Sequence, residues 1–210
     1  MQQAFSSNNS YMSDEQTYRT FIAIELPTEI RQHIKAHIDQ LRAEFPQVRA
    51  SWSRADNLHL TLKFLGDTPV SRIPSLSGAC SVAAGQIAPF ELIVKGCGTF
   101  PSHGKPKVLW IGIEEAPPSE NHLPELHAAL EDACAAQGFA REARRYHPHL
   151  TVARVRQAKD TLSLAERHRQ TDFASQRFAV SGINLFRSEL SSQGSKYFLL
   201  SHHECQNAER

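Results

Sequence analysis

Residues 58–66 read Leu-His-Leu-Thr-Leu-Lys-Phe-Leu-Gly, and residues 147–154 read His-Pro-His-Leu-Thr-Val-Ala-Arg. Both stretches alternate apolar and polar residues, which is typical of a strand with one face in a core. Residues two apart in a strand point to the same side. Each stretch therefore presents one histidine and one threonine together, His59 with Thr61 and His149 with Thr151. Two such strands predict one site built from two related halves.

The rest of the chain has an ordinary globular composition. Its 210 residues suit one domain or two small lobes, and its formal net charge of +1 makes no general case for nucleic acid. Between Arg141 and Arg156, however, five arginines stand against one acid, Glu142. Such a run is most often a solvated face, but this one brackets the second motif and favours an anionic substrate such as a phosphate.

Cysteine spacing and hydropathy indicate the compartment. Cys80, Cys97, Cys134 and Cys205 are too scattered for a disulfide framework or a zinc motif, so we expect free thiols in a reducing cytosol. No apolar stretch approaches the roughly 20 residues that span a bilayer. The N-terminal segment lacks the basic start and apolar run of a signal peptide. We expect a cytoplasmic protein without membrane contact.

Periodicity predicts alternating strands and helices. Helices are expected at 28–44, with Thr28 as N-cap, and at 70–87, 123–137 and 159–168, with Gly138 closing the third. Strands are expected at 19–26, near 52, around both motifs, and at 90–94, 107–113, 177–187 and 196–202. The pattern predicts an α+β fold with two pseudo-symmetric lobes of mostly antiparallel sheet, outer helices and a central cleft carrying both motifs. We assign residues 1–18 to a disordered leader, 19–203 to a single bilobal domain and 204–210 to a tail.

Two imidazoles facing each other across a cleft suit in-line displacement at phosphorus. In that reaction the attacking and leaving oxygens lie on opposite sides of the phosphorus atom. Imidazole has a pKa of about 6.5, so it can accept or donate a proton near neutrality. The threonine hydroxyls beside the histidines would donate hydrogen bonds to the non-bridging oxygens. The motifs therefore favour an acid–base pair that needs no metal.

The motif residues resemble the 2H phosphoesterase superfamily, named for two H-x-T/S-x motifs, and within it the bacterial RNA 2′,3′-cyclic phosphodiesterases, also called 2′-5′ RNA ligases. The likeness covers residues 19–200. It includes the opening strand at 19–24, the blocks at 57–62 and 64–66, the strand at 108–112 and the block at 148–154. Tyr146 and His147 depart from the family, whose members more often have Phe and a variable residue there. The N-terminal leader is also longer than usual.

The resemblance implies hydrolysis of RNA 2′,3′-cyclic phosphate ends to 2′-phosphomonoesters, with no metal and no organic cofactor. His59 would donate a proton to the leaving 3′ oxygen, and His149 would accept a proton from water. The implied partner is RNA with a cyclic phosphate end, including tRNA fragments or small cyclic nucleotides, and we expect a monomer. Two alternatives stay open: the reverse 2′-5′ ligation, which uses the same histidines, and a non-catalytic module that binds RNA ends.

Around the histidines we expect contacts to the substrate phosphate. Thr61, Thr151 and Arg154 are the expected phosphate ligands. Strict alternation turns Arg154 away from the face of His149, so its role requires a bulge or a strand end near the cleft. Lys63 is in register with the first motif and is either a phosphate contact or a solvated strand end.

Several aromatic and basic residues outside the motifs are weaker candidates for substrate contact. Phe100 and Tyr146, in or beside loops, are expected to stack on a terminal base. Arg187 and Tyr197, on the last two strands, are further candidates for base or phosphate contacts. Elsewhere, His33 and His37 lie one helical turn apart, a spacing that can hold a metal, but the sequence offers no third ligand. We therefore read them as a polar helix face.

Overall fold

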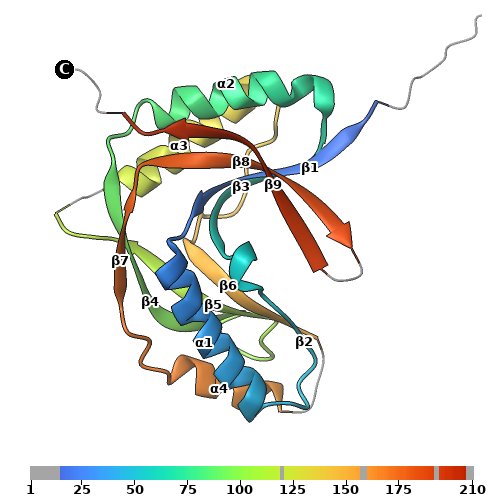
Figure 1. The fold of residues 1–210 in the computed structure, drawn as a ribbon, viewed down its shortest axis with the longest axis vertical. Helices are drawn as coiled ribbons and strands as arrows, with labels where there is room; N and C mark the ends of the chain where they lie inside the picture. Colours follow the sequence, from blue (N-terminus) through green and yellow to red (C-terminus); the bar gives the residue numbers. More distant parts are fainter. Residues whose placement is uncertain (1–14, 119–120, 157–159, 192–193, 207–210) are drawn as a thin grey trace, which may run out of the picture.

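The computed structural model describes residues 15–118, 121–156, 160–191 and 194–206. Over these ranges the chain forms two antiparallel sheets and four helices, which confirms the α+β class (Figure 1). The four-stranded sheet has the order β3-β1-β8-β9, and the five-stranded sheet has the order β2-β6-β5-β4-β7. The strands are β1 (Thr17–Glu25), β2 (Ala50–Trp52), β3 (His59–Pro69), β4 (Phe90–Phe100), β5 (Val108–Glu115), β6 (His149–Val155), β7 (Gln176–Val180), β8 (Gly182–Ser191) and β9 (Gly194–Glu204).

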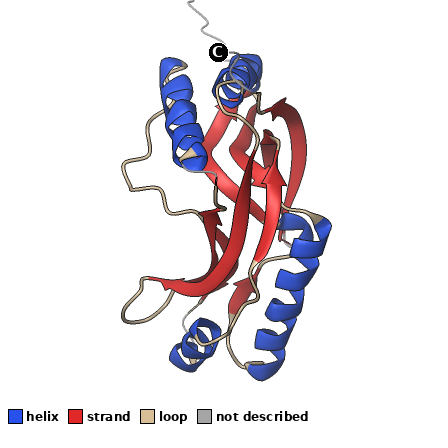
Figure 2. Cartoon of the chain, turned by 90° about the vertical axis from the view of Figure 1, so that its left-hand side faces the viewer, coloured by secondary structure: helices blue, strands red, loops and turns tan. Residues whose placement is uncertain are grey.

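The helices cover the sheets from outside, and the strands lie between the two pairs of helices (Figures 1 and 2). Helices α2 and α3 pack against each other over the four-stranded sheet, whereas α1 and α4 lie over the five-stranded sheet. The helices are α1 (Thr28–Glu44), α2 (Ile73–Ala84), α3 (His122–Ala136) and α4 (Thr161–Arg169). Two 3₁₀ turns, η1 (Ala55–Asn57) and η2 (Val70–Arg72), precede β3 and α2. None of the helices described is long and apolar enough to cross a membrane.

Helix α1 follows the predicted apolar pattern, because Ile30, Ile34, Ile38 and Leu41 are all buried. Its expected cap is wrong. Pro27 occupies the N-cap position, and its carbonyl accepts the first helical hydrogen bond, from the Arg31 N–H at 3.1 Å. Thr28 already lies inside the helix, where its hydroxyl accepts a bond from Arg31 rather than capping a backbone N–H.

Other boundaries differ modestly from the expected ones. The predicted helix at 70–87 is a 3₁₀ turn followed by α2, which places Pro74 in the first helical turn, where no N–H bond is lost. Strand β4 runs on to Phe100, into the stretch expected to be a connection. Gly138 has the positive φ of 78° expected after α3. The predicted start of the fourth helix, at 159, lies outside the described residues, as do residues 1–14 of the predicted leader.

The predicted strand at 177–187 is two strands in different sheets. Strand β7 pairs with β4 in the five-stranded sheet, and β8 pairs with β1 and β9 in the four-stranded sheet. The chain crosses between sheets at Ser181, whose carbonyl accepts a 2.8 Å bond from the Cys205 N–H. Gly182 follows because a Cβ there would lie 2.5 Å from the His203 carbonyl oxygen. Period-two patterning does not show that the chain changes sheets between two adjacent strands.

Candidate active site

His59 is the first residue of β3, and Leu58 separates it from the turn η1. Its Nδ1 lies 2.8 Å from the carbonyl oxygen of Asn57. A carbonyl only accepts hydrogen bonds, so Nδ1 carries the proton and Nε2 keeps its lone pair. The ring stacks on Phe21 with centroids 4.8 Å apart, and Tyr197 meets it edge-on at 5.3 Å. These contacts fix the imidazole and leave Nε2 as the reactive nitrogen.

His149 begins β6 and repeats this arrangement. Its Nδ1 lies 2.7 Å from the carbonyl oxygen of His147, again two residues earlier in the chain. The Phe100 ring meets its ring edge-on, with centroids 5.1 Å apart. Both motifs therefore fix the same tautomer with a local backbone carbonyl, and in both an aromatic ring lies nearly perpendicular to the imidazole. The backbone bond two residues back is a property of the two motifs that strand alternation alone did not predict.

Burial makes both imidazoles weak bases in the free protein. Loss of solvent lowers the pKa of His59 to about 4, and the hydrogen bond to Asn57 offsets only part of this effect. Loss of solvent also lowers the pKa of His149, partly offset by its bond to His147. Both rings are therefore neutral at pH 7 in the free protein. A bound phosphate anion would favour the protonated form again, because opposite charges stabilise each other.

A β-bulge follows the threonine in the first motif. Thr61 pairs with Ala23 of β1, but Lys63 pairs with Ile22, so Leu62 is an extra residue in β3. The bulge turns Lys63 to the face of Ile22, which is the core. The expectation that Lys63 shares a face with His59 is therefore wrong.

Lys63 is instead part of a buried ion pair. Its ammonium lies 2.7 Å from Glu131 of α3 and donates a second bond of 2.9 Å to the carbonyl of Ala140. Burial alone would raise the pKa of Glu131, but hydrogen bonds from Lys63 and from the Glu142 N–H, with the Lys63 charge, lower it overall. Lys63 therefore joins β3 to α3 and the segment after it, away from the motif histidines.

The second motif has a bulge at the same position. This bulge brings a predicted site residue to the motif face, whereas the first bulge turns one away from it. Thr151 pairs with Trp110 of β5, but Ala153 pairs with Leu109, so Val152 is the extra residue. The next residue, Arg154, returns to the face of Thr151 and is exposed. The bulge that the sequence analysis required for Arg154 is thus present.

The segments that precede the two motifs are joined to the opposite motif. The Tyr146 hydroxyl, three residues before His149, donates a 3.1 Å bond to the Thr61 carbonyl. The Ser53 hydroxyl, six residues before His59, donates a 2.6 Å bond to the Thr151 carbonyl. Strands β3 and β6 also contact each other, although they belong to different sheets. These reciprocal bonds hold the two motifs side by side.

Tyr146 is therefore placed differently from its expected role. Its ring stacks on His127 of α3 with centroids 4.0 Å apart and an interplanar angle of 12°. Burial raises the pKa of its hydroxyl, which is already engaged by Thr61. Because its ring and hydroxyl both have partners within the protein, Tyr146 connects the two motifs and is not available to stack on a base.

The remaining candidates divide between the two faces of the sheets. Tyr197 lies beside His59, and Phe100 lies beside His149, so both are brought to the motifs. Arg187 pairs with Thr20 of β1. The neighbouring pair, Phe21 and Phe186, lies on the same face of the sheet as His59, so Arg187 lies on the other face. The Arg187 guanidinium faces away from that site, between the rings of Tyr18 and Phe198, and forms a 2.8 Å ion pair with Glu189.

Sequence reasoning missed several aromatic neighbours of the motifs. Phe21 stacks on the His59 ring. Alternation within the first strand could have indicated that Phe21 lies on the same face as His59. Trp110 lies beside His147 at 5.0 Å, and its ring covers Gly98, where a Cβ would lie 2.2 Å from the indole. Phe64 follows the first bulge, lies 6.2 Å from Phe21 and is 67% exposed. Only knowledge of the bulge could have predicted its face.

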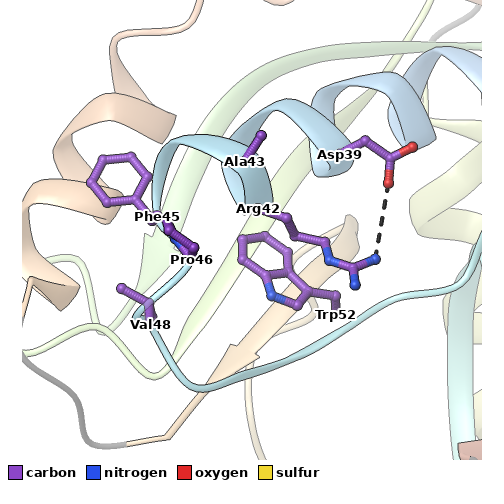
Figure 3. A pocket seen from close by; sticks show the side chains of 7 residues that line it. All are labelled: Asp39, Arg42, Ala43, Phe45, Pro46, Val48 and Trp52. Carbon is purple, nitrogen blue, oxygen red and sulfur yellow. Dashed lines mark ion pairs between the residues drawn. The ribbon is translucent and has the colours of Figure 1, made fainter.

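A separate hollow of about 460 Å³ lies between the end of α1 and the segment leading to β2 (Figure 3). Trp52 and Arg42 border it, and Arg42 lies 4.0 Å from Asp39. Neither motif histidine lines this hollow. The side chains that gather at the two motifs, and not this cavity, therefore define the candidate active site.

Comparison with known families agrees with the geometry. The model of the 2′-5′ RNA ligase superfamily matches residues 29–191, which include both motifs. The chain belongs to the 2′-5′ RNA ligase superfamily. An RNA 2′,3′-cyclic phosphodiesterase from Methanothermobacter thermautotrophicus is 32% identical over 182 residues, covering 85% of this chain and 94% of that protein. One from Geobacillus stearothermophilus is 33% identical over 170 residues, covering 81% of this chain but only 52% of that protein.

Solved structures of two other proteins have the same fold as this chain. A crystal structure of Escherichia coli LigT in complex with 3′-AMP has a TM-score of 0.68 and 26% identity, covering 91% of this chain and all of that one. A Thermus thermophilus protein gives a TM-score of 0.71 with 25% identity, covering 90% of this chain and 98% of that one. The fold is therefore shared with both of these proteins over about nine-tenths of the chain.

Proposed function

We propose that this protein hydrolyses RNA 2′,3′-cyclic phosphate ends to 2′-phosphomonoesters, with His59 and His149 as an acid–base pair. The observation that carries the proposal is the reciprocal pair of bonds from Tyr146 to Thr61 and from Ser53 to Thr151. These bonds join the motifs so that two fixed imidazoles serve one site. Relatives named RNA 2′,3′-cyclic phosphodiesterase at about 30% identity support the reaction.

In the proposed reaction His149 accepts a proton from water through Nε2 as the water oxygen attacks phosphorus. The bond from phosphorus to the 3′ oxygen breaks, and His59 donates a proton from Nε2 to that oxygen. His59 must therefore be protonated in the complex, although burial makes it neutral in the free protein. The bound phosphate anion raises the pKa of His59, because its negative charge stabilises the imidazolium form. Each group of this kind contributes about 10²- to 10⁴-fold.

The phosphate itself is held by residues on the motif face. The hydroxyls of Thr61 and Thr151, both half-buried, donate to its non-bridging oxygens. Arg154 adds a charge-assisted bond from the position that the second bulge gives it. The exposed ring of Phe64 and the edge of Phe100 offer apolar surfaces for the terminal nucleotide.

The chemistry of this pair requires neither a metal nor an organic cofactor, since attack by water, with one histidine accepting a proton and the other donating one, opens a strained cyclic phosphodiester. The substrates we propose are RNA ends, among them tRNA fragments, and small cyclic nucleotides. We also propose that the protein acts as a monomer in the cytoplasm, which size-exclusion chromatography with light scattering and fluorescence imaging of the tagged protein would test.

The same histidines would catalyse the reverse reaction, which joins a cyclic phosphate end to a 5′-hydroxyl. The superfamily is described by this 2′-5′ ligation, and this specific observation keeps it as a second candidate function. Rates measured on cyclic ends with and without a 5′-hydroxyl partner distinguish the two directions. A non-catalytic RNA-end binder would retain its affinity while releasing no product.

The decisive experiment incubates the protein and its His59→Ala and His149→Ala variants with a short RNA that ends in a 2′,3′-cyclic phosphate. We expect product with phosphate on the 2′ oxygen and a loss of at least about 10²-fold in each variant. The exposed His103 lies outside both motifs, so His103→Ala is the matched control. A 3′-phosphate product would reverse the assigned roles, and equal rates in all variants would contradict the proposal.

A further inference from the structure

Three potential metal ligands meet on the face of the five-stranded sheet that is turned away from His149. His37 of α1, Cys97 of β4 and His168 of α4 place one ligand atom each within 4.8 Å of the others. Cys97 pairs with Ile111, whose side chain is fully buried in the core. The neighbouring Trp110 lies on the other face of the sheet, the one that also holds His149. The cluster therefore lies outside the candidate active site, where α1 and α4 cover the sheet (Figure 1).

The two imidazoles of the cluster are already oriented. His168 Nε2 lies 3.0 Å from the carbonyl oxygen of Trp110, so it donates its proton there and Nδ1 keeps a lone pair. That Nδ1 lies 2.9 Å from His37 Nε2, which therefore donates to it. Metal-binding histidines usually donate their other N–H to a carbonyl or carboxylate, which sets the tautomer and the ring orientation. His168 has this arrangement before any ion binds.

We propose that His37, Cys97 and His168 form a binding site for a divalent ion of the zinc class. Two imidazole nitrogens and a thiolate are ligands that Zn²⁺ accepts in tetrahedral sites, with water completing the fourth position. On binding, the Cys97 thiol loses its proton to solvent and His37 moves its proton from Nε2 to Nδ1. No electrons are exchanged, and one proton is released for each ion bound.

Burial and position define what the ion would do. His37 is 6% exposed and His168 is fully buried, whereas Cys97 is half-buried. The three ligands come from elements far apart in the chain, and the two histidines are 131 positions apart. An ion would therefore link α1 and α4 to β4, and its effect falls on stability and not on the reaction.

Neighbouring residues identify which groups belong to this site. His33, the helical neighbour that the sequence paired with His37, bonds instead to Gln176 at 2.6 Å and is not a ligand. Phe173 contacts both His33 and His37 and provides apolar surface beside the cluster. The expected polar helix face is therefore wrong for His37, which is buried, and the two further ligands come from β4 and α4.

The test titrates the full-length, metal-free protein with Co²⁺, a spectroscopic substitute for Zn²⁺. We expect one ion per chain, tetrahedral ligand-field bands in the visible and a thiolate-to-cobalt band in the near ultraviolet. The thiolate band should vanish in Cys97→Ser and persist in the control Cys205→Ser, whose thiol is buried but lies outside the cluster. Absence of a thiolate band, or its survival in Cys97→Ser, would overturn the proposal.

A second readout keeps the test independent of variants that fail to fold. Zn²⁺ should raise the Tm of the unmodified protein, because an ion that binds only the native state stabilises it. It should not raise the Tm of Cys97→Ser, whose small change preserves the His37–His168 bond. An unchanged Tm in the unmodified protein would mean that the histidines form a structural hydrogen bond only. Hydrolysis should continue with or without the ion, so failure of this proposal is separate from failure of the proposed function.

Discussion

The Tyr146 hydroxyl donates a 3.1 Å hydrogen bond to the Thr61 carbonyl, joining the segment before one histidine motif to the strand of the other. Ser53 makes the reciprocal bond to Thr151 at 2.6 Å. The motif histidines are 90 residues apart in the chain, so contacts of this kind are needed to fix their relative position. The link between the motifs is thus built mainly from backbone acceptors, which substitution of the threonines does not remove.

Removing one of these links should weaken the protein measurably. We expect Tyr146→Phe to lower the free energy of unfolding by about 1 kcal/mol, the usual net value of one hydrogen bond, while the ring keeps its stack on His127. Urea denaturation measures the change. Tyr18→Phe, whose ring faces Arg187, is the matched control and should stay within about 0.5 kcal/mol. Equal behaviour of both variants would argue against a linking role for Tyr146.

Lys63 should matter for stability and not for phosphate binding. Its ion pair with Glu131 is buried, and loss of one partner of such a pair typically costs about 3–5 kcal/mol. We expect a loss of this order in Lys63→Met, with KM for the cyclic substrate unchanged at temperatures where the variant is folded. Lys95→Met breaks the exposed pair with Glu114 and should cost less than about 1 kcal/mol. A raised KM with unchanged stability would restore the phosphate role.

Arg154 should show the opposite behaviour. The bulge at Val152 directs it to the face of Thr151, so Arg154→Met should remove one charge-assisted bond to the phosphate. Such a bond is worth about 1.5–3 kcal/mol, which corresponds to a fall in kcat/KM of roughly 10- to 150-fold with little change in unfolding. Arg156→Met, another exposed arginine at the end of this segment, is the matched control. Similar kinetics in the two variants would remove Arg154 from the site.

The pH dependence of kcat/KM follows from the histidine environments. Burial lowers the pKa of His59 to about 4 and also lowers the pKa of His149 below 6.5. The profile of kcat/KM reports the free enzyme and is centred between its acid and base pKa values. We therefore expect a bell with its maximum below pH 6.5, measured with a fluorogenic cyclic phosphodiester. A monotonic rise through pH 9 is incompatible with the two-histidine mechanism.

Stability should fall over the same acidic range. Burial lowers the pKa of His37 to about 4 and also lowers that of His168, with smaller contributions from neighbouring charges. Below pH 6.5 the unfolded chain binds more protons at these histidines than the folded protein does, so stability decreases as pH falls toward 4. Denaturant midpoints between pH 7.5 and 4.5 measure this loss, which should shrink in His168→Gln. A midpoint independent of pH would show that these rings titrate normally when folded.

The sequence was a good guide to the elements and to the motif pairs, because alternation directly determines that His59 shares a face with Thr61. It did not predict the bulges at Leu62 and Val152, since an extra residue in a strand leaves no period-two signal. Each bulge reverses the alternation, which sends Lys63 into the core and returns Arg154 to the motif face.

Long-range contacts lay equally beyond the sequence pattern. The Tyr146 bond to Thr61 depends on how two sheets meet, and the cluster of His37 with His168 depends on how two distant helices pack. The break at Ser181 was also hidden, because only this one residue separates β7 from β8 although they join different sheets. Local periodicity indicates faces, whereas tertiary packing decides which faces come together.

The central claim is that both imidazoles act on one phosphorus atom. A crystal structure with a non-hydrolysable analogue of an RNA 2′,3′-cyclic phosphate end tests it most directly. We predict that Nε2 of His59 and Nε2 of His149 each lie within about 3 Å of oxygen atoms on the same phosphorus, on opposite sides of it. A phosphate held by one histidine alone, or by neither, would contradict the account.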